Sequence, residues 1–233
     1  MNLHDFAMQF GISAIARRHF GYRKPVSDTE LGGYAIRGTL TYMRALEASR
    51  MGLSHLEAHK AFEQGQQLVQ LGIAPSLIIT GCDQRNQDGG NATAEGIAVA
   101  GALPPSVFTS PAVTYPHYTS FAVVKDALEK YGDNAVHRML AGQLSGIWSE
   151  PASVFDARIC GSFTADYGVI GPVFFDLNFE QITLLYFRFV RGLELKEIPF
   201  EEGSWMPKMG GGVILSADRK VAREFASDLT IVE

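Results

Sequence analysis

Residues 58–95 constrain the fold more than any other part of the chain. Apolar residues recur at helical spacing from Ala58 to Val69, and the wholly apolar run Leu77–Thr80 follows after a turn. A polar, glycine-containing segment, residues 82–91, separates this run from a second helix-like pattern. A short run without polar alternation indicates a strand that is covered on both faces. This order of elements predicts an open α/β sheet with a ligand crevice.

A second unit of the same kind follows, with a strand predicted at Ser106–Thr109 and a helix at Phe121–Tyr131. Two such crossovers in succession favour parallel strands. We therefore predict one α/β domain over residues 1–233, three-layered, with a mainly parallel sheet and helices on both faces. Alternation at Leu193–Ile198 leaves an antiparallel edge in the second half as an open alternative.

Other elements are predicted from weaker patterns. Residues 1–20 are predicted to be one helix, because apolar residues follow one another at spacings of three and four. Further strands are predicted at residues 135–140, 154–160, 169–175 and 213–216, and a last helix at residues 217–225.

Composition and charge exclude several classes of protein. The net charge is −5, and no basic cluster is longer than Arg17-Arg18 or Arg23-Lys24, so we expect no nucleic-acid partner. No window holds the roughly 18 consecutive apolar residues of a membrane span, and the first 20 residues do not resemble a secretion signal. The two cysteines, Cys82 and Cys160, are too few for a disulfide framework. We expect a cytoplasmic protein without a membrane partner.

The segment 82–91 is the first candidate site, because ligands of open α/β sheets bind beyond the carboxyl ends of the strands. Asp83 is the candidate acid–base residue, and Arg85 is suited to bind a phosphate or a carboxylate in a bidentate manner. The backbone beside a helix N-terminus offers N–H groups to an anion. The proposed ligand-binding residues here are Arg85, Gly89, Gly90, Asn91 and Thr93. The same composition also suits a solvated loop.

The segment 110–118 is the second candidate, since it follows the neighbouring strand and should reach the same edge of the sheet. His117 is suited to acid–base chemistry near neutral pH, and Tyr115 offers a hydroxyl to a ligand. The alternative for His117 is a role in starting the next helix.

Other reactive side chains have ordinary explanations. His55 and His59 are four residues apart on a predicted helix, but no third metal ligand accompanies them, so no metal site is predicted. Cys82 and Cys160 each follow an apolar run, and buried, inert cysteine is the commoner state.

The sequence thus favours an enzyme for a small anionic metabolite that carries a phosphate or a carboxylate, with the reaction and any cofactor unknown. A non-catalytic assembly subunit is the alternative, indicated by the aromatic second half and the Trp205-Met206 segment. A ligand-binding regulatory domain is a third hypothesis. A homo-oligomer is left open.

Overall fold

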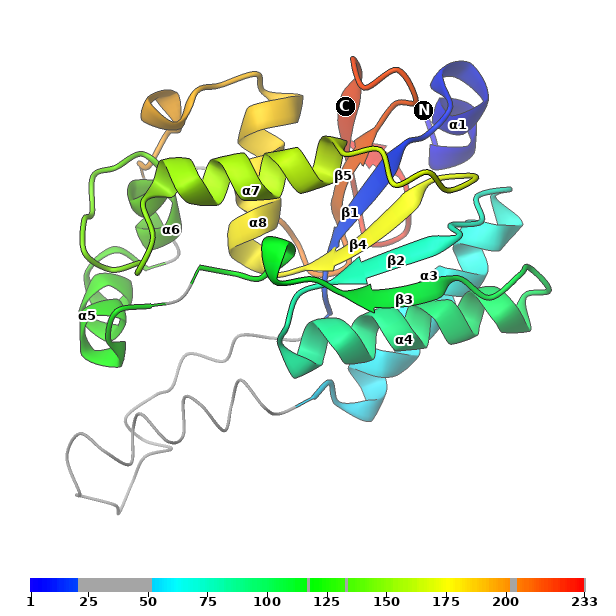
Figure 1. The fold of residues 1–233 in the computed structure, drawn as a ribbon, viewed down its shortest axis with the longest axis horizontal. Helices are drawn as coiled ribbons and strands as arrows, with labels where there is room; N and C mark the ends of the chain where they lie inside the picture. The colour runs from blue at the N-terminus through cyan, green and yellow to red at the C-terminus, as the bar shows by residue number, and fades with distance from the viewer. Residues whose placement is uncertain (21–51, 117, 133, 202–204, 233) are drawn as a thin grey trace.

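The computed structural model describes residues 1–20, 52–116, 118–132, 134–201 and 205–232. Within this part of the chain the sheet has seven strands in the order β3-β2-β4-β1-β5-β6-β7 (Figure 1). Four are parallel to one another: β1 (Ala14–Arg18), β2 (Leu77–Thr80), β3 (Ser106–Thr109) and β4 (Val173–Leu177). Three form an antiparallel edge: β5 (Gly212–Leu215), β6 (Ala222–Phe225) and β7 (Ile231–Val232). The predicted three-layer, mainly parallel α/β fold is confirmed.

The helices cover both faces of this sheet. They are α1 (Leu3–Phe10), α3 (His55–Gln70), α4 (Gln84–Val99), α5 (Phe121–Tyr131), α6 (Asn134–Leu140), α7 (Ala152–Thr164) and α8 (Phe179–Leu185), which continues as a π-helical turn over Tyr186–Val190. Two 3-10 turns, Pro111–Val113 and Leu195–Glu197, complete the set of helical segments described here. Ser54 caps α3 in a capping box with Glu57.

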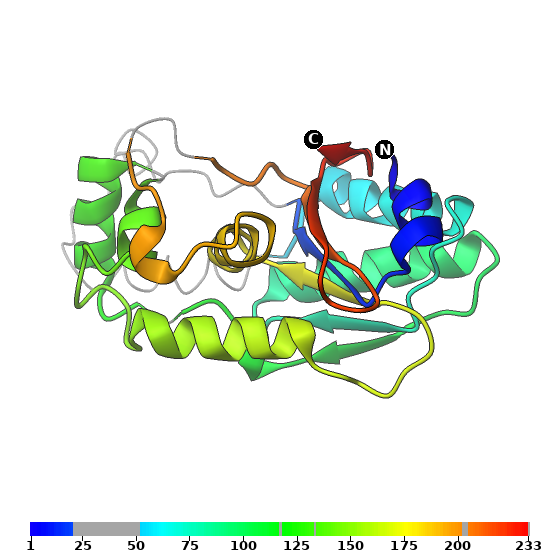
Figure 2. The same ribbon diagram turned by 90° about the horizontal axis from the view of Figure 1, so that it is seen from above.

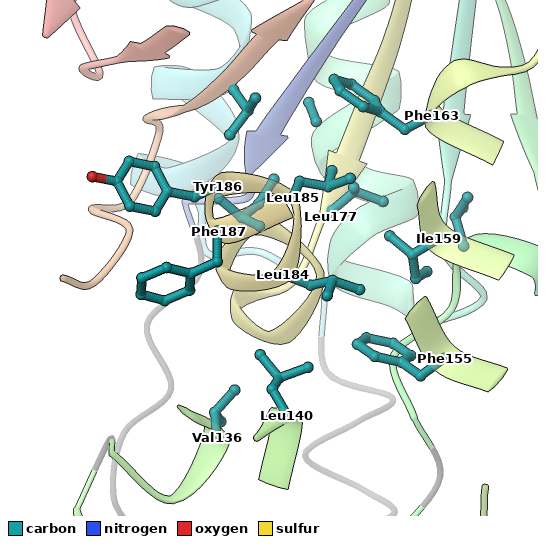
Figure 3. Packing of buried hydrophobic residues seen from close by; sticks show 14 of the residues in the cluster. Val136, Leu140, Phe155, Ile159, Phe163, Leu177, Leu184, Leu185, Tyr186 and Phe187 are labelled. Atoms are coloured by element: carbon teal, nitrogen blue, oxygen red, sulfur yellow. The ribbon is translucent and has the colours of Figure 1, made fainter. Parts of the chain in front are cut away.

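Alternation along the strands divides the buried residues between two cores. Ile15, Ile78 and Phe174 belong to the cluster that includes Leu68 of α3 and Ile97 of α4. Their strand neighbours Ala16, Ile79 and Phe175 belong instead to the cluster shared with α6, α7 and α8. Figure 3 shows α8 at the centre of this second cluster, with residues of α6, α7 and β4 around it.

Several weaker predictions are wrong. Residues 1–20 form α1 and then β1, because Gly11 ends the helix and the chain turns into the sheet. Residues 135–140 and 154–160 lie in α6 and α7, where burial of Phe155, Ile159 and Phe163 follows a helical spacing of four. The edge expected at residues 193–198 is a loop with a 3-10 turn, and the helix expected at residues 217–225 is replaced by a turn and β6.

The carboxyl ends of the four parallel strands lie at one edge of the sheet, with α5 and α6 beyond them (Figures 1 and 2). This edge is where the polar residues described below meet. In the described part of the chain, no helix combines the length and apolar character needed to cross a bilayer.

Candidate functional site

The first candidate segment is mostly helical. Helix α4 begins at Gln84, and the side chain of Asp83 caps it by accepting a hydrogen bond from Asn86 N at 3.1 Å. The loop predicted for residues 82–91 therefore ends at Asp83. Gly89 and Gly90 misled that prediction, because glycine has low helix propensity. A Cβ on Gly89 would collide with the Asp176 carboxylate, and one on Gly90 with the Thr80 side chain, so these glycines let the helix touch the strands.

The four residues predicted to bind an anion beside Arg85 are spread along α4. Gly89 and Gly90 are buried against the sheet, and Asn91 is exposed on the outer side of the helix. Thr93 is fully buried, and its hydroxyl donates to the carbonyl of Gly89 at 2.8 Å. The structure does not bring these residues to the N-terminus of α4, where the orphan N–H groups are.

Three side chains meet where β1, β2 and β4 end. His19 follows β1, and its backbone N–H donates to Leu177 O of β4 at 2.9 Å. Asn178 follows β4 and hydrogen-bonds the His19 side chain. Its Nδ2 also donates to Oδ2 of Asp83, which follows β2, at 2.9 Å. Neighbouring parallel strands thus bring together residues that are far apart in the sequence.

His19 is a neutral imidazole in a positively charged surrounding. Its pKa is lowered from 6.5 to about 3, first by burial and then by the charges of Arg18, Arg85 and Arg17. The hydrogen bond with Asn178 acts in the opposite direction. Because burial and positive neighbours both penalise the imidazolium, His19 carries no charge at neutral pH and keeps a nitrogen lone pair.

Asp83 is buried enough to perturb its acidity. Burial raises the pKa of its carboxyl group, and hydrogen bonds from Asn178 and Asn86 and the charge of Arg85 oppose this rise. Both oxygens of the carboxylate accept hydrogen bonds, Oδ1 from Asn86 N and Oδ2 from Asn178 Nδ2. The residue predicted to exchange protons is therefore held as an acceptor in this structure.

A buried ion pair lies behind the site. Arg17 Nη2 contacts Asp176 Oδ2, Nη1 donates to Gln64 Oε1 at 2.9 Å, and both charged side chains are fully buried. Burial raises the pKa of Asp176 to about 6, against the opposing effect of Arg17. Asn86 adds a further tie, since its Nδ2 donates to Asp176 O at 2.6 Å. This network joins α3, α4, β1 and β4 rather than facing a ligand.

The second candidate segment reaches the same edge. Cys82 N donates to Thr114 Oγ1 at 3.0 Å, so the residues after β2 and β3 are in direct contact. Tyr118 OH donates to Glu180 Oε1 at 2.6 Å in the first turn of α8, and the Tyr115 ring lies 6.2 Å from the Tyr118 ring. His117 lies outside the described residues.

The remaining candidates are not part of this cluster. His59 pairs with Glu63 on α3, and the described residues contain no group of three potential metal ligands. Cys160 lies in α7, where burial and then Asp156 raise the pKa of its thiol. Trp205 stacks on Tyr186 at 3.6 Å and donates to Glu224, so it packs within the protein.

The roles of His19, Arg18 and Asn178 were not predicted from the sequence. A helix predicted through residue 20 hid the fact that His19 comes after a strand. The available signal was Gly11 followed by the short aliphatic run Ala14–Ala16, which is how a helix ends and a buried strand begins. Asn178 could have been found as the polar residue directly between the strand Val173–Leu177 and the start of a helix.

Three solved structures with the same fold are named as phosphatases or as a phosphoglycerate mutase. The alpha-ribazole phosphatase of Shigella flexneri superposes with a TM-score of 0.57 at 13% identity, over 94% of this chain and 98% of that chain. A mycobacterial glucosyl-3-phosphoglycerate phosphatase with inorganic phosphate gives 0.54 at 13% identity, over 94% and 98%. The phosphoglycerate mutase of Bacillus anthracis gives 0.53 at 11% identity, over 95% and 90%. At these identities the likeness shows the fold alone.

The sequence itself matches no protein-family model and no curated protein.

Proposed function

We propose that this chain is a phosphomonoesterase for small phosphorylated metabolites and that His19 is its nucleophile. The observation that carries this proposal is a neutral imidazole surrounded by the charges of Arg18, Arg85 and Arg17. A neutral imidazole can attack phosphorus, whereas an imidazolium has no lone pair for the attack. Phosphatases and a phosphoglycerate mutase with the same fold support the phosphate over the carboxylate among the anions predicted from the sequence.

The reaction proceeds in two steps. A His19 nitrogen forms a bond to phosphorus while the ester P–O bond breaks, and the leaving alcohol oxygen takes up a proton from water. Water then attacks the phosphoryl group, the P–N bond breaks, and inorganic phosphate leaves with a neutral imidazole restored. The proton lost by the attacking water neutralises the hydroxide left by the first step. The guanidinium groups of Arg18 and Arg85 stabilise the negative charge on the phosphoryl oxygens in both steps. We assign Arg17 a contribution through its charge alone, since its Nη1 and Nη2 contact Gln64, Gly89 and Asp176.

The test is phosphate release from a panel of phosphomonoesters, including p-nitrophenyl phosphate and sugar phosphates. His19→Gln should lower kcat at least about 10³-fold, because it removes the nucleophile. His59→Gln is the matched control, since His59 is exposed on α3 and pairs with Glu63. It should retain full activity. Release that is equal in His19→Gln and in the unaltered protein would contradict the assignment.

A domain that binds phosphate esters without turnover is the second candidate. Both carboxylate oxygens of Asp83 accept hydrogen bonds from Asn86 and Asn178, so the side chain is engaged within the protein rather than with a leaving group. This candidate predicts calorimetric binding of inorganic phosphate that Arg85→Ala weakens, together with no phosphate release from any ester. The roles of His117 and Tyr115 and a homo-oligomeric state stay predictions from the sequence.

A further inference from the structure

Asn178 occupies an N-cap position but does not cap its helix. Asparagine at this position ordinarily accepts a hydrogen bond from the first turn of the helix. The Asn178 side chain makes no such bond to α8, and its Nδ2 instead donates to Asp83 Oδ2 at 2.9 Å. The side chain is thus diverted from a local stabilising role toward the end of β2.

Asp83 fixes which way the Asn178 amide faces. A carboxylate only accepts hydrogen bonds, so the amide must present its NH₂ group to Asp83 and its carbonyl oxygen elsewhere. Asp83 is itself held on the other side, because Asn86 N donates to its Oδ1 at 3.1 Å at the start of α4. The reversed amide would set two oxygens against each other. The orientation of Asn178 is therefore determined by the N-terminus of α4.

The same orientation determines the contact with His19. The two side chains hydrogen-bond each other, and this contact raises the pKa of His19 against the effect of burial. Because Nδ2 is turned toward Asp83, we take Asn178 Oδ1 as the acceptor of a ring N–H. In a neutral imidazole one nitrogen carries hydrogen and the other carries the lone pair. An acceptor fixed beside one ring nitrogen keeps the hydrogen on that nitrogen and leaves the lone pair on the other.

We infer that Asn178, oriented by Asp83, sets the tautomer of His19 and so selects the ring nitrogen that attacks phosphorus. Asn178 and Asp83 are positioning residues in this scheme. The neutral amide suits the task because it accepts the ring N–H without adding a charge. An aspartate at residue 178 would favour the imidazolium, which cannot attack. The kinetic part of the inference rests on the proposed function, whereas the tautomer assignment does not.

Two-bond ¹H–¹⁵N spectra of the full chain test the inference directly, with the His19 signal identified by its loss in His19→Gln. The unaltered protein should show one neutral tautomer at pH 7, and Asn178→Ala a mixture of both. Asp83→Ser keeps a capping oxygen for α4 but has no second oxygen for Asn178, so it should also give a mixture with little change in Tm. Asn178→Asp should shift His19 toward the imidazolium.

Kinetics supply the second readout. Asn178→Ala should lower kcat for p-nitrophenyl phosphate about 100-fold with KM changed less than about threefold, because the nucleophile is misplaced while the arginines are unchanged. Gln67→Ala, which removes an exposed amide from α3, is the control and should match the unaltered protein.

A single unchanged tautomer in both Asn178→Ala and Asp83→Ser would overturn the inference. If the unaltered protein released no phosphate while the tautomer still changed in the variants, the proposed function would fail and the tautomer assignment would stand. If Asn178→Ala did not fold, Asp83→Ser would decide the matter.

Discussion

The two faces of the sheet are built in different ways. On the α3 and α4 face, helix backbones lie directly against each other and against the strands, because glycines such as Gly96 remove side chains at the contacts. Hydrogen bonds and the pair of Arg17 and Asp176 complete that face. On the α7 and α8 face the contacts are aromatic, with Phe163 edge-on to Phe175 at 5.7 Å.

This difference indicates which face fixes the positions of the residues in the site. Backbone contacts leave little freedom for α4, and the N-terminus of α4 carries Asp83 and Arg85. Aromatic packing tolerates exchange of side chains more readily. We therefore expect damage to the glycine and ion-pair face to affect both stability and function, and damage to the aromatic face to affect stability alone.

The largest effect should come from breaking the buried ion pair. Asp176→Ala leaves Arg17 charged, buried and without its partner, so the free energy of unfolding should fall by about 4 kcal/mol. Urea denaturation measures this change. The double variant Arg17→Met with Asp176→Leu removes both charges and should recover most of the loss. A cost below about 1 kcal/mol for Asp176→Ala would show that the pair does not hold this face together.

A methyl group added to the close contact should have the next largest effect. A Cβ at Gly96 would collide with the Phe62 carbonyl, so Gly96→Ala should cost about 3 kcal/mol and lower activity as α4 shifts. Gly161→Ala in α7 is the matched control, since a Cβ there meets nothing within 4 Å. It should stabilise the protein by about 0.5–1 kcal/mol, because alanine favours the helix. Equal effects of the two substitutions would remove the contrast between the faces.

The pH dependence of stability should report the neutral state of His19. Its pKa of about 3 in the folded protein lies below the ordinary histidine value of 6.5, so the unfolded chain binds more protons as the pH falls below 6.5. The stabilising contribution is complete above pH 6.5 and is lost as the pH falls toward 3. Relative to His19→Gln, the unaltered protein should lose about 2 kcal/mol between pH 6.5 and pH 5. Parallel pH profiles of the two proteins would contradict a buried neutral imidazole.

The smallest effect should come from an exchange on the aromatic face. Phe163→Leu loses edge-to-face contacts with Phe175 and Phe189 but keeps a large apolar side chain, so it should cost about 1 kcal/mol. Phosphate release should be unchanged at 25 °C, since Phe175 and Phe189, the rings that Phe163 meets, are not residues of the site. A tenfold fall in kcat would show that the aromatic face also positions the site.

The contrast also explains how far the sequence could predict the molecule. Helix α3 and strand β2 were predictable, because a capping box and an apolar stripe lead into an apolar run. The start of α4 was not predictable, because Gly89 and Gly90 lower the helix propensity of this segment. Their role is to let α4 pack closely on the strands, and that contact is visible only in the folded sheet. Sequence patterns reflect the local propensity for helix or strand, and a glycine that is needed at a tertiary contact lowers that propensity.

Only part of the site could be predicted, because only part of it follows from local sequence patterns. Asp83 and Arg85 follow a strand that the sequence marks clearly, and the rule on carboxyl ends of strands locates them correctly. His19 and Asn178 join them only because β4 inserts between β2 and β1. Asn178 and Asp83 are 95 residues apart, and no local pattern encodes a pairing over that distance.

The central claim is that His19 forms a bond to phosphorus, and trapping that bond tests it most directly. The protein is mixed with excess p-nitrophenyl phosphate, quenched in alkali and digested for mass spectrometry, since a phosphoryl group on imidazole is labile in acid. We expect the peptide containing His19 to carry one phosphoryl group, and the His19→Gln protein to carry none. Steady phosphate release without any phosphoryl group on His19, or with one on another residue, would contradict the account.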